Sequence, residues 1–325
     1  MRVLVRLPNW IGDATNAIPA ILNLKKAGHS VEGICHRRVS PIFENLIPCH
    51  VFYSRKSMEM LSIKQHGKFD VGIVFPVSFS SAFGMWLAHP KVRIGFNGEF
   101  RSIFLTHVIN KNHFWKREHI VESYLRLLSP LGIKPKRLEP RVELKNCEEV
   151  LKKFNLIGKK FIAISPFANY GPAKEWPFEN FHKVGKIIKS WGFDVVLLGS
   201  QGDASKVKNG ESIDFINLVG KTSLRETMCI LAHSITLLSI DSGLSHLGVA
   251  YGTEVLTIFL STDPNWTAPY GERGHFIYHK LPCSPCFKRI CPLGTYECYK
   301  TVTTEEVLDR LQTILKDAQQ TFDRD

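Results

Sequence analysis

The chain has 325 residues, of which 44% are hydrophobic, so it can bury the cores of about two domains of ~150 residues each. The first residues, 1–7, have the character of a short strand rather than of a signal peptide. No apolar run approaches the ~20 residues that a membrane-spanning helix needs. These features argue against an integral membrane protein, and we expect a soluble protein made in the cytoplasm.

The net charge of +12 is distributed unevenly. Residues 1–157 contain 24 Lys and Arg against 12 Asp and Glu, whereas residues 158–325 contain 18 of each. A one-sided excess favours an acidic partner for the first half, such as nucleic acid, an anionic membrane surface or an anionic lipid headgroup. The alternative is a basic surface with no specific role.

Apolar strands and amphipathic helices alternate along the chain, which predicts parallel sheets covered by helices. In the first half we expect strands at 2–7, 31–35, 69–75 and 92–96, and helices at 14–27, 80–87 and 119–131. In the second half we expect strands at 161–165, 194–198, 235–240 and 255–260, and helices at 148–155, 178–191, 224–232, 244–251 and 304–318.

Two Rossmann-like α/β domains follow from this repetition, with boundaries at 1–157 and 158–325. Their parallel sheets are expected to face a central cleft, and the last helix is a candidate to pack back on the first domain. Ligands in such folds bind beyond the carboxyl ends of the strands. No Gly-x-Gly-x-x-Gly, complete Walker A loop, Gly-x-Ser-x-Gly or His-Glu-x-x-His motif is present, which argues against the enzyme classes that use them.

Asp13 ends the loop Pro8-Asn-Trp-Ile-Gly-Asp13, directly after the first strand. A carboxylate at the carboxyl end of a strand is well placed to act on a ligand. The same residue precedes a helix, so it can also be read as a plain N-cap.

Lys174 lies in the loop from Pro166 to Pro177, which is rich in Gly and Pro and follows the first strand of the second half. A lysine held there can neutralise a diphosphate as a point charge. The alternative is a solvated lysine, which is usual for this residue type.

The segment Asp241-Ser-Gly-Leu-Ser-His246 joins a strand to a helix. Gly243 permits close approach of a ligand to the backbone, and the amides at the helix start form an anion site. Asp241 and His246 flank this site, although His246 can also be a packed helix histidine.

Four of the eight cysteines are dispersed and four are clustered. Cys35, Cys49, Cys147 and Cys229 are typical of scattered thiols, and without a secretion signal we do not expect structural disulfides. The clustered cysteines have the spacing Cys-x2-Cys-x4-Cys-x6-Cys, which is compact enough for one tetrahedral metal. We expect a structural site of the zinc type, with local packing of reduced thiols as the alternative; its members are Cys283, Cys286, Cys291 and Cys298.

These segments resemble those of the heptosyltransferases of glycosyltransferase family 9. The resemblance runs from Arg2 to the last helix, and the Lys174 loop and the clustered cysteines are most similar to the heptosyltransferase II branch. Gly199, in Leu198-Gly-Ser200, and Asp203 resemble the strand end near the donor nucleoside.

The resemblance implies a GT-B fold and an inverting transfer of heptose from ADP-heptose that requires no metal cofactor. Asp13 is then the general base, and Lys174 with the backbone amides of Ser242, Gly243 and Leu244 stabilises the departing diphosphate. Asp241 and His246 are expected to bind the heptose or the phosphates.

The implied acceptor is the Kdo–lipid A inner core of lipopolysaccharide, most closely at the second heptose addition. The acceptor and the anionic inner membrane face would explain the basic first half, and no nucleic acid is expected. The alternatives are the first or third heptose addition, another sugar transferase of this fold, or a non-catalytic sugar-nucleotide-binding relative. Candidate contacts with the acceptor or the membrane are Arg37, Arg38, Arg55, Lys56, Arg93, Arg101, Lys111, Lys116 and Arg117.

Overall fold

The computed structural model describes residues 1–52, 67–207 and 214–322, and the chain divides into two compact units. Unit 1 comprises Met1–Val142 and unit 2 comprises Glu143–Asp325. Each unit contains one six-stranded sheet in which all strand pairs are parallel. The expected α/β class is therefore confirmed.

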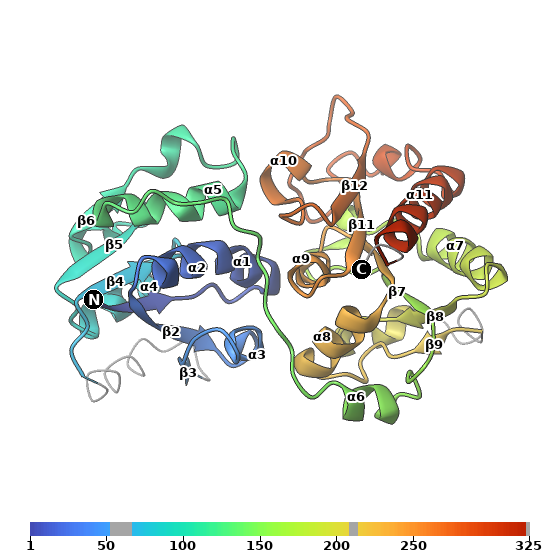
Figure 1. Cartoon of the computed structure of the whole chain (residues 1–325). Helices are drawn as coiled ribbons and strands as arrows, with labels where there is room; N and C mark the ends of the chain where they lie inside the picture. Colours follow the sequence, from blue (N-terminus) through green and yellow to red (C-terminus); the bar gives the residue numbers. More distant parts are fainter. Residues whose placement is uncertain (53–66, 208–213, 323–325) are drawn as a thin grey trace. The chain divides into compact units, whose positions relative to one another are not determined.

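The sheet of unit 1 has the strand order β3-β2-β1-β4-β5-β6 (Figure 1). Its centre is β1, whose apolar residues are fully buried because helices cover both faces of a parallel sheet. The strands are β1 Arg2–Arg6, β2 Ser30–His36, β3 Cys49–Phe52, β4 Val71–Val74, β5 Val92–Phe96 and β6 His107–Ile109. The α-helices are α1 Ile11–Asn16, α2 Ile18–Lys26, α3 Ser40–Phe43, α4 Phe79–Leu87 and α5 Ile120–Leu125, and 3₁₀ turns form η2 Arg101–Phe104, η3 Lys111–His113 and η4 Arg126–Leu131.

The sheet of unit 2 repeats this topology with the order β12-β11-β10-β7-β8-β9. The strands are β7 Phe161–Ser165, β8 Asp194–Leu197, β9 Ile216–Asn217, β10 Thr236–Ile240, β11 Glu254–Phe259 and β12 Gly274–Tyr278. The α-helices are α6 Glu148–Lys153, α7 Phe178–Ser190, α8 Leu224–His233, α9 Gly243–Ala250, α10 Pro264–Thr267 and α11 Thr304–Phe322, and 3₁₀ turns form η5 Pro172–Lys174, η6 Gln201–Lys206 and η7 Glu297–Tyr299.

The division between the units falls 15 residues before the expected boundary at 157/158. The reason is α6, which packs against α8 and so belongs to unit 2. An ion pair between Lys153 and Glu226 (2.6 Å) joins the two helices. The functions expected for the two domains stay predictions.

A disulfide between Cys147 and Cys229 also joins this helix pair, with their Cα atoms 5.3 Å apart. The expectation that both are dispersed thiols was therefore wrong. The two residues are 82 positions apart in the sequence, and only the packing of α6 on α8 brings them together. Cys35 and Cys49 are free thiols, as expected.

The last helix, α11, packs on α7 and β11 of unit 2. Its apolar side chains at 307, 311, 314 and 315 join the core cluster of that unit. Thr303 Oγ1 accepts a hydrogen bond from the Glu306 backbone N–H (3.2 Å), which caps the start of this helix. In the part of the chain that the structure describes, no helix is both long and apolar enough to cross a bilayer.

Candidate functional site

The order of the strands indicates where a ligand is expected in unit 2, at the carboxyl end of the sheet. From β7 the chain proceeds to β8 and β9 on one side, whereas β10, β11 and β12 lie on the other. In such sheets ligands usually bind in the crevice between two neighbouring strands from which the chain continues toward opposite sides of the sheet. Here that crevice lies between the loops after β7 and after β10, which contain Lys174 and Asp241 respectively.

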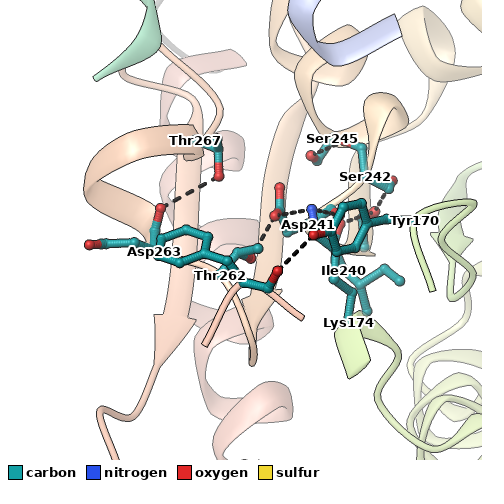
Figure 2. Close-up of polar contacts among 11 residues, drawn as sticks. Tyr170, Lys174, Ile240, Asp241, Ser242, Ser245, Thr262, Asp263 and Thr267 are labelled. Atoms are coloured by element: carbon teal, nitrogen blue, oxygen red, sulfur yellow. Dashed lines mark hydrogen bonds and ion pairs between the residues drawn. The ribbon is translucent and has the colours of Figure 1, made fainter. Parts of the chain in front are cut away.

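Lys174 and Asp241 form a buried ion pair in this crevice (Figure 2). Lys174 Nζ lies 2.5 Å from Asp241 Oδ2 and 3.3 Å from the Asp241 carbonyl oxygen. The side chains are 14% and 5% exposed, so the lysine is not the solvated residue of the alternative interpretation. The same Asp241 oxygen accepts a hydrogen bond from Thr262 Oγ1 (2.6 Å), which follows β11.

Tyr170 supports the lysine from the other side. Lys174 Nζ lies 5.0 Å from the centroid of the Tyr170 ring, and the Arg289 guanidinium carbon lies 5.2 Å from the same centroid. The Tyr170 hydroxyl donates to the Phe287 carbonyl oxygen (2.8 Å). The aromatic ring therefore connects the Lys174 loop with the segment that carries the clustered cysteines.

The start of α9 lies beside the ion pair, because Asp241 immediately precedes its N-cap, Ser242. Ser242 makes no side-chain cap, and its hydroxyl lies 3.2 Å from Ser239 Oγ. The first-turn amides of α9, at Gly243 and Leu244, thus follow within three residues of Asp241, whose carboxylate and carbonyl oxygen contact Lys174 Nζ. An ammonium and a helix start together form an anion site.

His246 lies on α9 and is buried, as a packed helix histidine would be. Its expected contact with the donor stays a prediction.

The end of β8 lies next to the Lys174 loop. Both oxygens of the buried Asp203 carboxylate are engaged: Oδ2 accepts from Ser200 N (3.0 Å) and Oδ1 lies 3.0 Å from Lys206 Nζ. Lys206 also pairs with Glu175 (2.6 Å), the residue after Lys174. Asp203 therefore holds the turn after β8, and contact of Asp203 or Gly199 with the donor nucleoside stays a prediction.

Gly199 is confined by its surroundings. A Cβ there would lie 3.1 Å from Val219 Cγ1 and 3.4 Å from Phe167 Cδ2, so a larger residue would press on the Lys174 loop.

In unit 1 the corresponding crevice lies between β1 and β4, and Asp13 follows β1. The helix starts earlier than expected: Trp10 is the N-cap and Asp13 is the third residue of α1, so Asp13 is not the plain N-cap. A negative charge is favourable at this positively polarised helix start. Asp13 lies close to buried Tyr124, and burial together with the Asp13 charge raises the pKa of that phenol well above its usual value.

The loop before Asp13 is held by Arg6. This buried side chain donates from Nη2 to Asn9 Oδ1 (3.1 Å) and lies over the Phe52 ring at 4.6 Å. Burial lowers the pKa of Arg6 to about 10.

The clustered cysteines line one cavity of about 30 Å³, together with Ala173 of the Lys174 loop. Its cysteines are Cys283, Cys286, Cys291 and Cys298. Within residues 1–52, 67–207 and 214–322, however, no three His, Cys, Asp or Glu side chains stand in metal-binding geometry. The expected zinc site is therefore not formed by the thiols as they lie.

Sequence reasoning did not find Thr262 or Tyr170. The sequence does carry a signal for Thr262, because Ser261-Thr262 is a polar pair directly after an apolar strand, at the edge where the site lies. Tyr170 has no such signal, since its role depends on Arg289 and Phe287, more than 100 residues away.

Comparison with known proteins identifies the family of the chain. Residues 62–297 match glycosyltransferase family 9 (heptosyltransferase). The chain is 26% identical over 335 residues to lipooligosaccharide heptosyltransferase 2 of Campylobacter jejuni, covering 98% of this chain and 99% of that protein.

Two solved structures share the fold over nearly the whole chain. The structure of Escherichia coli ADP-heptose lps heptosyltransferase II has a TM-score of 0.83 at 22% identity and covers 98% of this chain and 100% of that chain. A glycosyl transferase family 9 structure from Veillonella parvula has a TM-score of 0.84 at 18% identity and covers 97% of each. The expected GT-B class is thus supported, and the chain is a glycosyltransferase that belongs to family 9, the heptosyltransferase family.

Proposed function

We propose that the protein transfers heptose from ADP-heptose to the inner core of lipopolysaccharide, as the second heptose addition and with inversion at the anomeric carbon. The observation that carries the proposal is the buried Lys174–Asp241 pair beside the start of α9. Lys174 supplies a cation and the start of α9 supplies backbone amides, at the carboxyl edge of the sheet where ligands bind in such folds. The names of the relatives at 24–26% identity supply the sugar and the acceptor.

Asp13 is the proposed general base. The acceptor hydroxyl attacks the anomeric carbon of heptose while the bond from that carbon to the ADP oxygen breaks. The hydroxyl proton passes to the Asp13 carboxylate, and the electron pair of the broken bond leaves on ADP. A base in hydrogen-bond reach is typically worth ~10²–10⁴-fold in rate.

Lys174 and the α9 amides are the proposed stabilisers of the leaving ADP. Preorganised donors of this kind perform the electrostatic work that a divalent cation performs in other transferases. We therefore propose that transfer needs no metal. Activity that survives exhaustive chelation would support this, and activity restored only by added Mg²⁺ would contradict it.

A structural zinc at the four cysteines also remains a proposal. Four thiolates suit zinc, and all four cysteines line one cavity, although their thiols would have to move to bind it. Stoichiometric zinc in the purified protein that is lost in Cys283→Ser/Cys286→Ser supports the site. Metal-free protein with full activity removes it.

We propose that the basic unit 1 binds the anionic acceptor and contacts the cytoplasmic face of the inner membrane. Unit 1 has 21 Lys and Arg against 9 Asp and Glu, so the excess of 12 lies within it. Among the candidate contacts, Arg101 is fully buried, so its expected contact with the acceptor or the membrane was wrong. Arg55 and Lys56 lie outside the described residues. Exposed candidates are Arg37, Arg38, Lys116 and Arg117.

The testing experiment measures ADP release from ADP-heptose with a mono-heptosylated Kdo–lipid A acceptor. Wild type is compared with Asp13→Asn, Lys174→Met and the exposed control Lys183→Met. We expect acceptor-dependent release that is reduced at least ~10²-fold in the first two variants and unchanged in the control. The anomeric configuration of the product, determined by NMR, tests inversion.

The other outcomes identify the alternatives. Release only with an acceptor that lacks heptose assigns the first addition, and release only with a longer core assigns the third. Binding of ADP-heptose without release on any core acceptor would contradict heptose transfer and favour a non-catalytic relative.

A further inference from the structure

Unit 1 exposes large apolar side chains on α4 and on the turn that leads into η2. Phe100 is 94% exposed and Ile103 79%, while Phe79 and Trp86 are 42% and 38% exposed. The turn η2 packs against α4, and Glu99 of the turn before it accepts from the Phe79 backbone N–H, so these residues lie on neighbouring segments of unit 1. We name this part of the surface the aromatic face. Contiguous exposed apolar groups on a protein of this kind mark a contact with a partner or a membrane.

The rings of the aromatic face pack on one another. Phe79, Phe83 and Trp86 recur at helical spacing, with Phe83 stacked on Phe79 at 6.2 Å and on Trp86 at 5.8 Å. Phe104 of η2 lies between them, 5.2 Å from Phe79 and 5.3 Å from Phe83. The face is therefore a preformed aromatic layer.

The turn that presents Phe100 is fixed on both sides. Gly98, Glu99 and Phe100 all have positive φ angles (126°, 45° and 53°), a backbone conformation that residues other than glycine seldom adopt. Glu99 Oε2 accepts from the Phe79 backbone N–H (2.8 Å), which ties the turn to the start of α4. The buried Arg101 donates from Nη1 to the Pro76 carbonyl oxygen and anchors the other end. The fold therefore holds Phe100 in place at this exposed position.

The segment that forms the aromatic face is basic. Residues 79–117 contain six Lys and Arg and one acidic residue, Glu99. Of the six cations, Arg101 is buried, Arg93 and Lys111 are half-buried, and three are exposed: Lys91, Lys116 and Arg117. Lys111 lies beside the turn, 3.4 Å from where a Cβ of Gly98 would be. Lys116 and Arg117 are exposed in the loop after η3. Aromatic side chains flanked by long cations are the composition of surfaces that lie in the interface of an anionic bilayer.

We propose that the aromatic face is a bilayer-contact surface, in which Phe100 and Ile103 enter the interfacial layer of an anionic phospholipid membrane. Charge complementarity selects the membrane as the partner, because the cations of this segment would meet acidic headgroups while the rings meet acyl chains. This inference deepens the proposed function, since a lipid-anchored acceptor is reached at such a surface.

The test is co-sedimentation of the full chain with vesicles of phosphatidylglycerol and phosphatidylcholine in equal amounts, and with vesicles of phosphatidylcholine alone. Wild type should bind the anionic vesicles, and more weakly as salt rises. Phe100→Ser/Ile103→Ser should bind at least about tenfold more weakly. Phe100→Leu, which keeps an apolar side chain, should bind as wild type does. The matched control is Ile157→Ser/Ile187→Ser, which removes two exposed apolar side chains from unit 2.

Transfer assays separate this inference from the proposed function. Phe100→Ser/Ile103→Ser should keep wild-type kcat/KM on a deacylated, water-soluble acceptor and lose it on a vesicle-embedded acceptor. If wild type transfers heptose to neither acceptor, the proposed function is contradicted. The bilayer contact is not affected by that result, because vesicle binding is measured without an acceptor. Equal vesicle binding by wild type and the double variant overturns the bilayer contact. A dimer in gel filtration that the double variant dissociates also overturns it, because a second copy then covers the face.

Discussion

Thr262 donates a 2.6 Å hydrogen bond to Asp241 Oδ2, the oxygen that also receives Lys174 Nζ. The two side chains follow neighbouring strands, β11 and β10, whose pairing sets the distance between them. Thr262 thus orients Asp241, and Asp241 orients Lys174. Thr262 acts through another residue and is a positioning residue.

Thr262→Val tests this role because valine preserves the shape and removes only the hydroxyl. The lost hydrogen bond to a buried carboxylate is worth about 1–2 kcal/mol, so we expect kcat/KM for the donor to fall about 5–30-fold. ADP affinity, measured by calorimetry, should fall in parallel. Thr267→Val is the control, since its hydroxyl makes a long contact of 3.5 Å with the Asp263 carbonyl oxygen. A Thr262→Val enzyme with wild-type kinetics would show that the contact is incidental.

Lys174→Met should damage stability as well as activity. It leaves the Asp241 carboxylate, which is 5% exposed, without its cation, and breaking a buried pair in this way costs about 3 kcal/mol. The double variant Lys174→Met/Asp241→Asn should recover most of the free energy of unfolding in urea but none of the activity. If the single variant is as stable as wild type, the pair is weaker than its burial indicates.

Gly171→Ala should displace the Lys174 loop. Gly171 has a φ of 149°, and a Cβ there would lie 2.6 Å from the Arg289 carbonyl oxygen. The Ala173 backbone N–H donates to that oxygen (3.0 Å), so the clash should break the contact that holds the loop. We expect at least tenfold lower kcat/KM. Gly158→Ala, which also has a positive φ but meets no atom within 4 Å, should keep wild-type activity in the same assay.

The disulfide between Cys147 and Cys229 predicts a stability that depends on reductant. It closes a loop of 82 residues, and loops of this length stabilise the folded state by about 4 kcal/mol. Reduction should therefore lower Tm in calorimetry, and Cys147→Ser/Cys229→Ser should show the lower value with or without reductant. Thiol titration of the unfolded, unreduced protein should find six reactive cysteines of the eight. Eight would contradict the bond.

The sequence predicts the centre of each sheet better than its edges. The interior strands, such as β1 and β10, consist mainly of apolar residues, because both of their faces are buried. The four strands that were not predicted, β3, β6, β9 and β12, are the edges of the two sheets. Edge strands here are short or half exposed, as β9 with two residues shows, so their composition resembles that of loops.

In the candidate site, too, features set by the local sequence could be predicted, whereas contacts between distant segments could not. Lys174, Asp241 and Asp13 follow strands whose order can be inferred, so their places at the carboxyl ends could be predicted. Contacts between segments that lie far apart in the sequence could not be predicted. The Cys147–Cys229 disulfide and the Tyr170–Arg289 contact are of this kind.

The ammonium of Lys174 has an anionic partner within the protein, the Asp241 carboxylate. If a diphosphate binds Lys174 as proposed, it competes with that carboxylate for the ammonium and does not meet an isolated cation. When the ADP of the proposed reaction departs, Asp241 can pair with the lysine again, so the ammonium is not left without a counter-charge. The proposed function therefore predicts that the ion pair moderates nucleotide affinity and favours release of product between turnovers.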